Sequence, residues 1–316
     1  MTARAMQLAL LALCRIEGVT GAQWQMIARQ ASVASGLQRL VEGVIDERGR
    51  TATKLRENLT AGLPQLDRYT EEAVEALHRA EDVQARLVTV LDDEYPPNLR
   101  AVYNLPPFLF VQGRLEEDDL RSVAVVGTRE PSSDGLTRAR QMAGGLAEQR
   151  VTVASGLAAG IDAAAHEACL EAGGRTIAVT GTGIRRTYPA SNEALRERIL
   201  AEGGAILSQF WPDQPPGRHT FPLRNVVMSG ISQGTVVIEA SDTSGARMQA
   251  RLATEHGKQV FLLHSLVTDF DWARTYVSER RAVEVRSVND VVRHLASPEK
   301  ARAAHQLREQ LSLQLS

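Results

Sequence analysis

The stretch SVAVVGTREPSSDGLTRARQMAGGLAEQRVTVAS, residues 122–155, decides the fold of this chain. It begins with a short run of small and apolar residues, 122–126, which predicts a buried strand. A turn containing glycine, arginine, proline and serine follows, and apolar residues then recur at helical spacing over 134–149. A second apolar run, 151–155, completes the unit. This order of strand, turn, helix and strand is typical of two parallel strands joined by a crossover helix.

The same unit repeats on the C-terminal side of residue 155. Short apolar runs predict strands over 175–181, 205–209, 235–240 and 259–264, and an edge strand over 282–287. Segments of helical periodicity separate or follow these runs over 160–173, 191–203, 223–232, 245–257 and 288–296. Continuous apolar runs indicate burial on both faces of a sheet. We therefore predict a Rossmann-like α/β fold, with a doubly wound, mostly parallel sheet.

The regions around this core have different patterns. Residues 1–88 have helical periodicity broken by glycines, and they predict a small all-α domain of the helix-hairpin-helix or SAM-like kind. The turn GVTG, 18–21, supports this interpretation, although packing alone also explains such a turn. Two Pro-Pro pairs break helices in 89–120, which we predict to be a linker with a short strand that leads into the core. The core then spans 121–297, and a polar, helix-prone tail spans 298–316.

Composition and charge limit the function. The net charge of −2 does not indicate a nucleic-acid protein. The core is nevertheless mildly basic, because residues 121–264 carry 15 Lys and Arg against 13 Asp and Glu, whereas residues 1–120 carry 13 against 18. Nearly all cations are arginines, which suit phosphate oxygens, although a GC-rich genome would give the same bias. Aromatic residues make up only 4%, which argues against a binder that relies mainly on base stacking.

Cysteine usage and the N-terminus indicate a cytoplasmic protein. Cys14 and Cys169 lie far apart, and no His/Cys cluster has zinc spacing. The apolar run near the N-terminus is too short to span a bilayer and lacks a cleavage site. We expect no metal, no cofactor and no contact with a membrane.

Glycine, serine, threonine and arginine gather just after the predicted strands. In a parallel sheet these positions meet at one edge, where ligands bind. Glycine lets the backbone approach an anion, helix N-termini supply amides, and arginine adds a charged fork. Packing explains one such turn, but four together predict an anion-binding edge. The candidate phosphate-binding residues are Gly127, Thr128, Arg129, Ser155, Gly156, Gly181, Arg224, Asn225, Ser244, Gly245 and Arg247.

The stretch FPLRN, 221–225, opens a predicted helix. Proline is favoured at the first helical position, so Pro222 is expected there or close by. Arg224 and Asn225 then fall in the first turn, where they can reach a phosphate or a base edge.

Catalytic and cofactor motifs are weak or missing. No GxGxxG follows the first core strand, and GxxxxGK[ST] does not occur. Asp162 and His166 lie four apart on one helix face, but capping and packing explain them better than catalysis does. Glu239 could act as a base at a strand end, or it could equally accept a hydrogen bond from a neighbouring turn amide. We assign no catalytic residue and expect no enzyme.

Six segments, in order and at appropriate spacing, resemble the DNA-processing protein A family, DprA or Smf. They are YPPNLRAVYNLPPFLFVQG (95–113), VAVVGTREPSSDG (123–135), SGLAAGIDAAAH (155–166), TGTGIRRTYP (180–189), FPLRNVVMSGIS (221–232) and VVIEASDTSGARMQARLA (236–253). The resemblance implies a Rossmann-like core that binds single-stranded DNA, a homodimer, and loading of the recombinase RecA during natural transformation. It places the family's phosphate pocket on Gly127, Thr128, Arg129, Ser155, Gly156, Arg224, Asn225, Ser244 and Gly245.

The chain also departs from the family pattern. Val226 stands where a second arginine is usual, and Gln209 stands where a glutamate is usual. SGARMQA, 244–250, replaces SGSLxTA, so Arg247 is new there. Residues 264–285 replace a proline-glycine turn and a glycine-rich segment, and the winged-helix domain of many members does not follow. These changes suggest a divergent paralogue.

Three functions stay open on the sequence. The first is a single-stranded-DNA binder in DNA uptake and recombination. The second is a nucleotide-sensing or phosphoribohydrolase-like enzyme of the same fold group, whose signature Gly234, Thr235 and Glu239 loosely resemble. The third is a phage-defence component that uses the same pocket.

Overall fold

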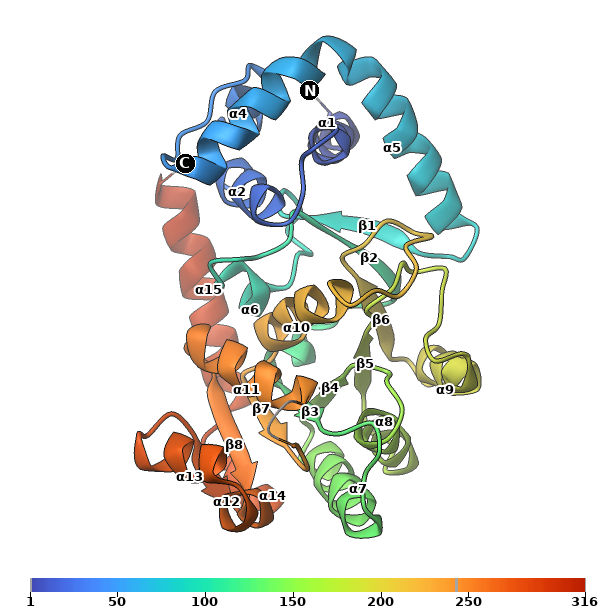
Figure 1. The fold of residues 1–316 in the computed structure, drawn as a ribbon, viewed down its shortest axis with the longest axis vertical. Coiled ribbons are helices and arrows are strands. Elements are labelled where there is room, and N and C mark those ends of the chain that lie inside the picture. Colours follow the sequence, from blue (N-terminus) through green and yellow to red (C-terminus); the bar gives the residue numbers. More distant parts are fainter. Residues whose placement is uncertain (1, 242–243, 316) are drawn as a thin grey trace.

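A mixed sheet runs through the centre of the molecule (Figure 1). The computed structural model describes residues 2–241 and 244–315, and within them the sheet has nine strands in the order β1-β2-β6-β5-β4-β3-β7-β8-β9. The strands are β1 (Arg86–Thr89), β2 (Phe108–Gly113), β3 (Ser122–Val126), β4 (Thr152–Ser155), β5 (Thr176–Val179), β6 (Ala205–Ser208), β7 (Gly234–Val237), β8 (Gln259–Leu263) and β9 (Val283–Val285).

Strands β3 to β9 are parallel, and only β1 and β2 are antiparallel additions beside β6. The prediction of a Rossmann-like, mostly parallel sheet is therefore confirmed, and so is the edge strand β9. The chain lays β4, β5 and β6 on one side of β3 and then returns to place β7, β8 and β9 on the other. This reversal makes the carboxyl ends of β3 and β7 the topological switch point, where open α/β sheets bind ligands.

Helices cover both faces of the sheet because alternate residues of each strand point to opposite sides. In β3, Val123 and Val125 pack in the cluster formed with α7 and α8, whereas Ala124 and Val126 belong to the larger cluster that includes α10 and α11. The helices of the core are α7 (Ser133–Glu148), α8 (Ile161–Glu171), α9 (Glu193–Ala201), α10 (Thr220–Ile231), α11 (Gly245–Glu255), α12 (His264–Asp269), α13 (Asp271–Ser278) and α14 (Val288–Val292), with 3₁₀ turns η2 (Glu117–Arg121) and η3 (Ala190–Asn192).

The N-terminal region is a helical domain that lies above the sheet in Figure 1. It consists of α1 (Ala3–Arg15), α2 (Ala22–Ala31), α3 (Gly36–Val41), α4 (Arg50–Gly62), η1 (Leu63–Gln65) and α5 (Leu66–Glu81). Leu10, Leu11 and Leu13 of α1 are fully buried, since α1 packs against α5 at the centre of the domain. Trp24 of α2 meets Phe108 of β2 at a ring distance of 5.5 Å, which joins the helical domain to the sheet through one apolar cluster.

The segment predicted as a linker is part of the sheet. The predicted boundary after residue 88 falls inside β1, and 89–120 contribute α6 (Pro97–Arg100), β2 and η2. Phe108 and Phe110 are fully buried, and Phe108 packs against Trp24 and Trp211. The Pro-Pro pairs prevent long helices here. The apolar run that follows the second pair, 108–113, nevertheless joins the sheet by pairing with β6.

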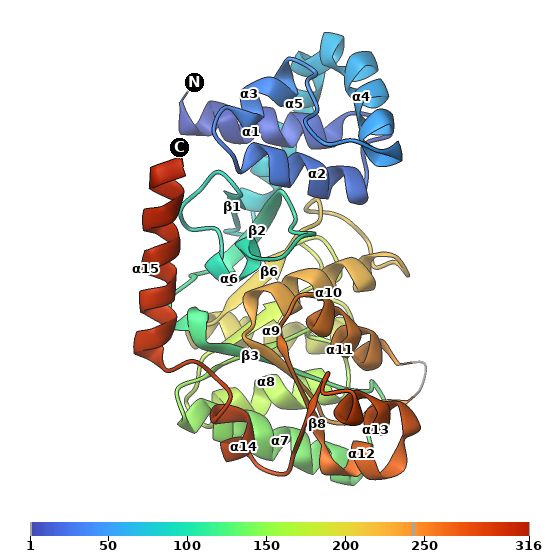
Figure 2. The same cartoon turned by 90° about the vertical axis from the view of Figure 1, so that its left-hand side faces the viewer.

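The C-terminal tail forms α15 (Pro298–Leu315), which runs along one side of the sheet toward the helical domain (Figure 2). Arg302 ties it to η2 through Glu117 at 3.2 Å and Asp118 at 3.0 Å. Within the residues that the structure describes, no helix has the length and apolar character needed to cross a bilayer.

Candidate functional site

A cavity of about 340 Å³ opens at the switch point, beside the carboxyl ends of β3 and β7. We call it the carboxyl-end cavity. Its walls come from the turn after β3, the start of α8, one face of α10, and the turn that begins α11. The lining residues are Val126, Gly127, Thr128, Arg129, Ala158, Asp162, Phe221, Arg224, Asn225, Met228, Ser241, Ser244, Gly245, Ala246 and Gln249. The structure thus brings together seven of the predicted residues: Gly127, Thr128, Arg129, Arg224, Asn225, Ser244 and Gly245.

One face of α10 forms the floor of the cavity. Phe221, Arg224, Asn225 and Met228 follow the spacing i, i+3, i+4, i+7, which places them on one side of a helix. The helix begins at Thr220, so Arg224 and Asn225 lie in its second turn, and their predicted place in the first turn is wrong. The helix can begin two residues before Pro222. The amides of a helix's first turn have no intrahelical partner, so a proline, which lacks this amide, is tolerated at the third helical residue.

Arg224 is the central cation of the floor. Its side chain is only 7% exposed, and its Nη1 lies 3.8 Å from Oδ2 of Asp162, which is equally buried. The same Asp162 oxygen accepts a hydrogen bond from the amide of Gly156 at 3.1 Å. Burial lowers the pKa of Arg224 and raises the pKa of Asp162, and the attraction within the pair opposes both shifts. Arginine stays charged in proteins, so the pair keeps a cation at the cavity floor.

Arg129 supplies a second cation at the mouth of the cavity. Its side chain is exposed, and its guanidinium carbon lies 4.7 Å from the ring centre of Phe221. Among the described residues, Arg129 forms no ion pair. The turn that carries it is rigid, since the amide of Thr128 donates to the carbonyl of Glu239 at 2.9 Å and its carbonyl accepts from Ile161 at 3.2 Å. A cation on a fixed turn, with no described carboxylate in ion-pair contact, is available for an anionic ligand.

The N-terminus of α11 faces the same space. Ser244 caps this helix by accepting a hydrogen bond from the amide of Arg247 at 3.2 Å. Gly245 is exposed, and the first-turn amides of a helix carry partial positive charge that favours anions. Behind them, Oε1 of Gln249 is buried without a hydrogen-bond partner. The wall formed by α11 therefore offers both donors and an unsatisfied acceptor.

Three predicted residues do not reach the cavity. Ser155 is fully buried and donates to the carbonyl of Val125 at 2.7 Å. Gly156 lies behind Arg224, because a Cβ atom at this position would come within 1.3 Å of Nη1. Gly181 makes room for the ring of Phe221, which a Cβ atom there would approach to 2.7 Å. These turns hold the cavity floor in place from behind, so a glycine turn after a strand does not by itself indicate an exposed site.

Arg247 also lies outside the lining of the cavity. Its guanidinium carbon is 5.6 Å from the ring centre of Trp272 on α13, so this side chain is directed toward the rewritten segment 264–285.

The candidate acids and bases have structural partners. Glu239 accepts hydrogen bonds from the amide of Ser132 at 3.1 Å and from its hydroxyl at 2.7 Å, and it does not line the cavity. His166 is fully buried and hydrogen-bonds Thr176 at 2.7 Å, and burial lowers its pKa to about 3. Within the described part of the chain, no group of three or more His, Cys, Asp or Glu side chains is placed to hold a metal ion.

Sequence reasoning missed Phe221 and Gln249 as lining residues. Both had a readable signal, since Phe221 shares a helix face with Arg224, and Gln249 follows Gly245 by one turn. The prediction concentrated on the turns that follow strands. In the structure, side chains of α10 and α11 supply much of the cavity wall.

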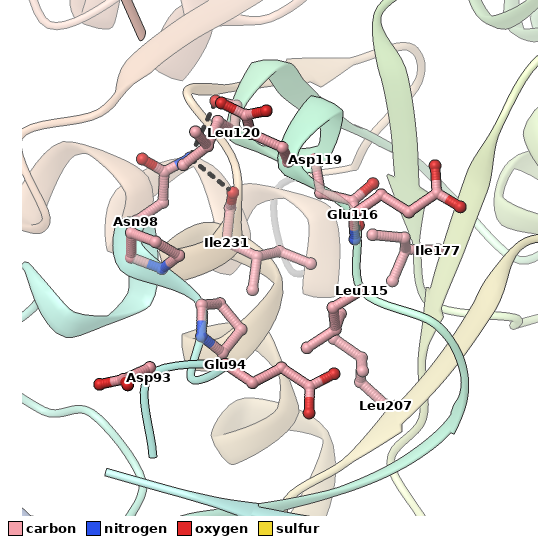
Figure 3. Close-up of a pocket in the computed structure, with 13 residues that line it drawn as sticks. Asp93, Glu94, Asn98, Leu115, Glu116, Asp119, Leu120, Ile177, Leu207 and Ile231 are labelled. Carbon is pink, nitrogen blue, oxygen red and sulfur yellow. Dashed lines mark hydrogen bonds between the residues drawn. The ribbon is translucent and has the colours of Figure 1, made fainter. Parts of the chain in front are cut away.

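A second cavity, of about 210 Å³, lies at the opposite edge of the sheet (Figure 3). We call it the amino-end cavity, because Leu120 and Ile231 of its wall precede β3 and β7. Asn98 crosses it and donates to the carbonyls of Leu120 at 3.0 Å and Ile231 at 3.1 Å. Its charged lining residues are all acidic: Asp93, Glu94, Glu116, Glu117 and Asp119. This edge does not suit an anion.

Known proteins resemble this chain in sequence and in fold. The family model of DNA recombination-mediator protein A matches residues 86–296, beginning at β1. A Protein Smf from Synechocystis is 41% identical over 182 residues, which are 56% of this chain and 46% of that relative, so the chain spans about half of its length.

Two solved structures add to this. DNA processing protein A from Streptococcus pneumoniae superposes with a TM-score of 0.72 at 29% identity, covering 94% of this chain and 99% of that one. DNA processing protein A from Helicobacter pylori, a structure described for its single-stranded DNA binding mode, has a TM-score of 0.59 at 25% identity, covering 66% and 94%. The expected resemblance is confirmed, and the chain belongs to the family of DNA recombination-mediator protein A, the DprA or Smf proteins.

Proposed function

We propose that this chain binds single-stranded DNA by holding its phosphates at the carboxyl-end cavity. One observation carries the proposal: Arg129, Arg224 and the open N-terminus of α11 converge on one space at the switch point of the sheet. Guanidinium groups and helix amides are the donors that proteins use for phosphate oxygens. Of the described residues that line this space, Asp162 is the one carboxylate, and it is held by Gly156 and Arg224.

The similarity to the Helicobacter pylori protein supports DNA as the source of the phosphates. A free nucleotide is the competing ligand, because the fold group also includes nucleotide hydrolases. Catalysis on a nucleotide would need a general base at the cavity. Glu239 is hydrogen-bonded to Ser132, and Asp162 is buried against Arg224. Neither carboxylate is placed to act as a base, so the geometry favours binding of a ligand over catalysis.

We further propose that the bound strand serves DNA uptake and recombination in the cytoplasm, with delivery to RecA, and that the chain acts as a homodimer. Family membership supports this role. Mass measurement in solution tests the dimer, and RecA filament assembly on single-stranded DNA coated by its binding protein tests delivery.

The direct test is a titration of fluorescently labelled oligo-dT, with duplex DNA and AMP as competitors. We expect the single strand to bind more tightly than either competitor. Three phosphate contacts would lower the affinity roughly twentyfold between 50 and 200 mM salt. An affinity that does not respond to salt, or a preference for AMP with release of its base, would overturn the proposal.

A further inference from the structure

A third cavity, of about 380 Å³, lies between the helical domain and the sheet. We call it the interdomain cavity. The end of α1 and the turn before α2 form one wall, and the segment after β6 together with α10 forms the other. Glu17, Gly18 and Thr20 at its rim are exposed, so the cavity opens to solvent. The residues that carry the following argument are Arg15, Trp24, Gln209, Trp211, Leu223 and Val226, all of which line it.

The walls of the interdomain cavity are aromatic although the chain as a whole is poor in aromatics. Trp24 and Trp211 meet edge to face with ring centres 6.0 Å apart. The guanidinium carbon of Arg15 lies over the Trp211 ring at 4.1 Å. Planar faces of aromatic rings and guanidinium groups are the surfaces on which proteins stack unpaired bases.

Two polar groups in this cavity are incompletely hydrogen-bonded. Gln209 is only 7% exposed, and its carboxamide makes no hydrogen bond to any described residue. The Nε of Arg15 is buried without a hydrogen-bond partner, although it lies 4.0 Å from the carboxylate of Glu72. Polar groups inside proteins are nearly always hydrogen-bonded, so the Gln209 carboxamide is the group in this cavity that is available to a polar ligand. A carboxamide both donates and accepts, as the edges of nucleobases do.

The cavity is held in shape without a ligand. The indole Nε1 of Trp24 donates to the carbonyls of Cys14 at 3.0 Å and Val19 at 3.1 Å, which fixes the turn after α1. Asn58 of α4 donates to the carbonyl of Gly18 at 2.8 Å and holds the same turn from outside. A preformed site loses little conformational freedom on binding.

Helix α10 separates the interdomain cavity from the carboxyl-end cavity. Phe221 and Arg224 line the carboxyl-end cavity, whereas Leu223 and Val226, on another face of the same helix, line the interdomain cavity. A helix with its side chains is about 10–12 Å across, a width that a strand a few nucleotides long can pass around. A strand held by its phosphates at one cavity can therefore place a base in the other.

We infer that the interdomain cavity binds an unpaired nucleobase of the DNA strand whose phosphates occupy the carboxyl-end cavity. Arg15 and Trp211 provide the stacking surface, and the Gln209 carboxamide contacts the edge of the base. The inference rests on the proposed function, and it adds a contact between the helical domain and DNA.

The first test compares oligo-dT with an abasic strand of the same length, on the parent chain and on Gln209→Met. Methionine keeps the side-chain length but removes the hydrogen bonds. We expect the parent to bind oligo-dT about tenfold more tightly than the abasic strand, and Gln209→Met to lose most of this difference while binding the abasic strand as before. Gln38→Met makes the same change on the exposed face of α3 and should change neither affinity.

The outcomes separate this inference from the proposed function. Equal loss on both strands, or no loss on either, overturns the base site and leaves phosphate binding intact. Failure of the parent chain to bind either strand overturns the proposed function and the base site together.

A second measurement uses the unaltered chain and so does not depend on the folding of a variant. Oligo-dT carrying 5-iododeoxyuridine is cross-linked by light and the protein is digested with trypsin. Trp24 lies on the peptide 16–29 and Trp211 on 199–218, whereas Phe221 of the carboxyl-end cavity lies on 219–224. Peptide 219–224 also carries His219 and Leu223 of the interdomain cavity, so the cross-linked residue itself is identified by sequencing the peptide. Cross-links on Trp24, Trp211 or His219 support the base site, and cross-links confined to Phe221 overturn it.

Discussion

The carboxyl-end and amino-end cavities occupy opposite edges of one sheet and differ in the sign of their charge. Arg129 and Arg224 line the first, with the N-terminus of α11 beside them. Among the described residues, five carboxylates and no cation line the second. Strand polarity contributes to this contrast, because crossover helices in a parallel sheet begin near the carboxyl ends of the strands and present their amides there.

The two cavities differ further in how their charges are compensated. At the amino end, Arg175 lies 2.7 Å from Asp119 and 3.6 Å from Glu116, and Arg302 lies 3.2 Å from Glu117. These carboxylates fasten η2 and α15 to the sheet. At the carboxyl end, Arg129 forms no ion pair within the described residues. The unpaired Arg129 is therefore the charge that we expect to meet a ligand, whereas the paired carboxylates of η2 stabilise the fold.

The largest effect is expected from Arg224→Met. Removing the guanidinium leaves Asp162 buried without its cation, which should lower the free energy of unfolding by about 3–5 kcal/mol. Oligo-dT binding should fall as well, because the cation of the cavity floor is lost. Urea unfolding and fluorescence anisotropy measure the two effects.

The double variant Arg224→Met with Asp162→Asn separates stability from binding. Asparagine keeps an oxygen for the amide of Gly156 and carries no charge, so much of the stability should return. The affinity for DNA should stay low. A double variant that binds as tightly as the parent chain would show that Arg224 is only a structural cation.

The next effect concerns pH and the fully buried His166 behind the cavity. Its pKa is lowered to about 3, so the folded chain keeps it neutral while the unfolded chain protonates it below about 6.5. The unfolded state then binds more protons, and stability is lost as pH falls from 6.5 toward 3. We expect a loss of about 2 kcal/mol between pH 7 and 5 from this group.

Comparison with His166→Asn at each pH isolates this contribution, since the raised pKa of Asp162 acts in the opposite direction and is common to both proteins. The variant should show a shallower decline in urea midpoint on acidification. Parallel curves for the two proteins would contradict the buried, neutral state of His166.

Much of the fold was predictable because the spacing of apolar residues along the chain is a local property of the sequence. The apolar runs located β3 to β9 and showed that they are parallel, and the helical spacing located the crossovers. The place of β2 was not predictable, since pairing of Phe110 with Ser208 joins segments nearly a hundred residues apart. Proline pairs near β2 indicated a linker, whereas long-range burial of the two phenylalanines decided the outcome.

The candidate site was predictable in residue type and less so in position. Arg129 and Ser244 lie where a turn after a strand predicts them. Gly156 and Gly181 lie in equivalent turns, but the side chains of α10 cover them: Arg224 lies against Gly156, and Phe221 lies against Gly181. The interdomain cavity was not predictable, because Trp24 and Trp211 meet only in the folded chain.

A smaller effect is expected from Arg129→Ala, which tests the uncompensated cation. The side chain is exposed and unpaired in the described structure, so stability should stay within about 0.5 kcal/mol of the parent. Affinity for single-stranded DNA should fall about fivefold to tenfold for every sequence, and the slope of log affinity against log salt should decrease by about 0.7–1. Arg302→Ala removes an arginine from the compensated edge and should leave the affinity unchanged. An equal loss in both variants would mean that net charge, rather than the cavity, attracts DNA.

The smallest effect is expected from Asp93→Asn with Glu94→Gln at the amino-end cavity. Five residues of β3 separate the two edges, a distance of about 17 Å at 3.3 Å per residue. Exposed charges this far apart are largely screened at 0.15 M salt, where the Debye length is about 8 Å. The affinity for oligo-dT should therefore stay within about twofold of the parent, with a modest gain only at low salt. A tenfold gain at 0.15 M salt would break the comparison, because the DNA would then have to pass close to both edges, and the acidic cavity would act as a barrier on its path.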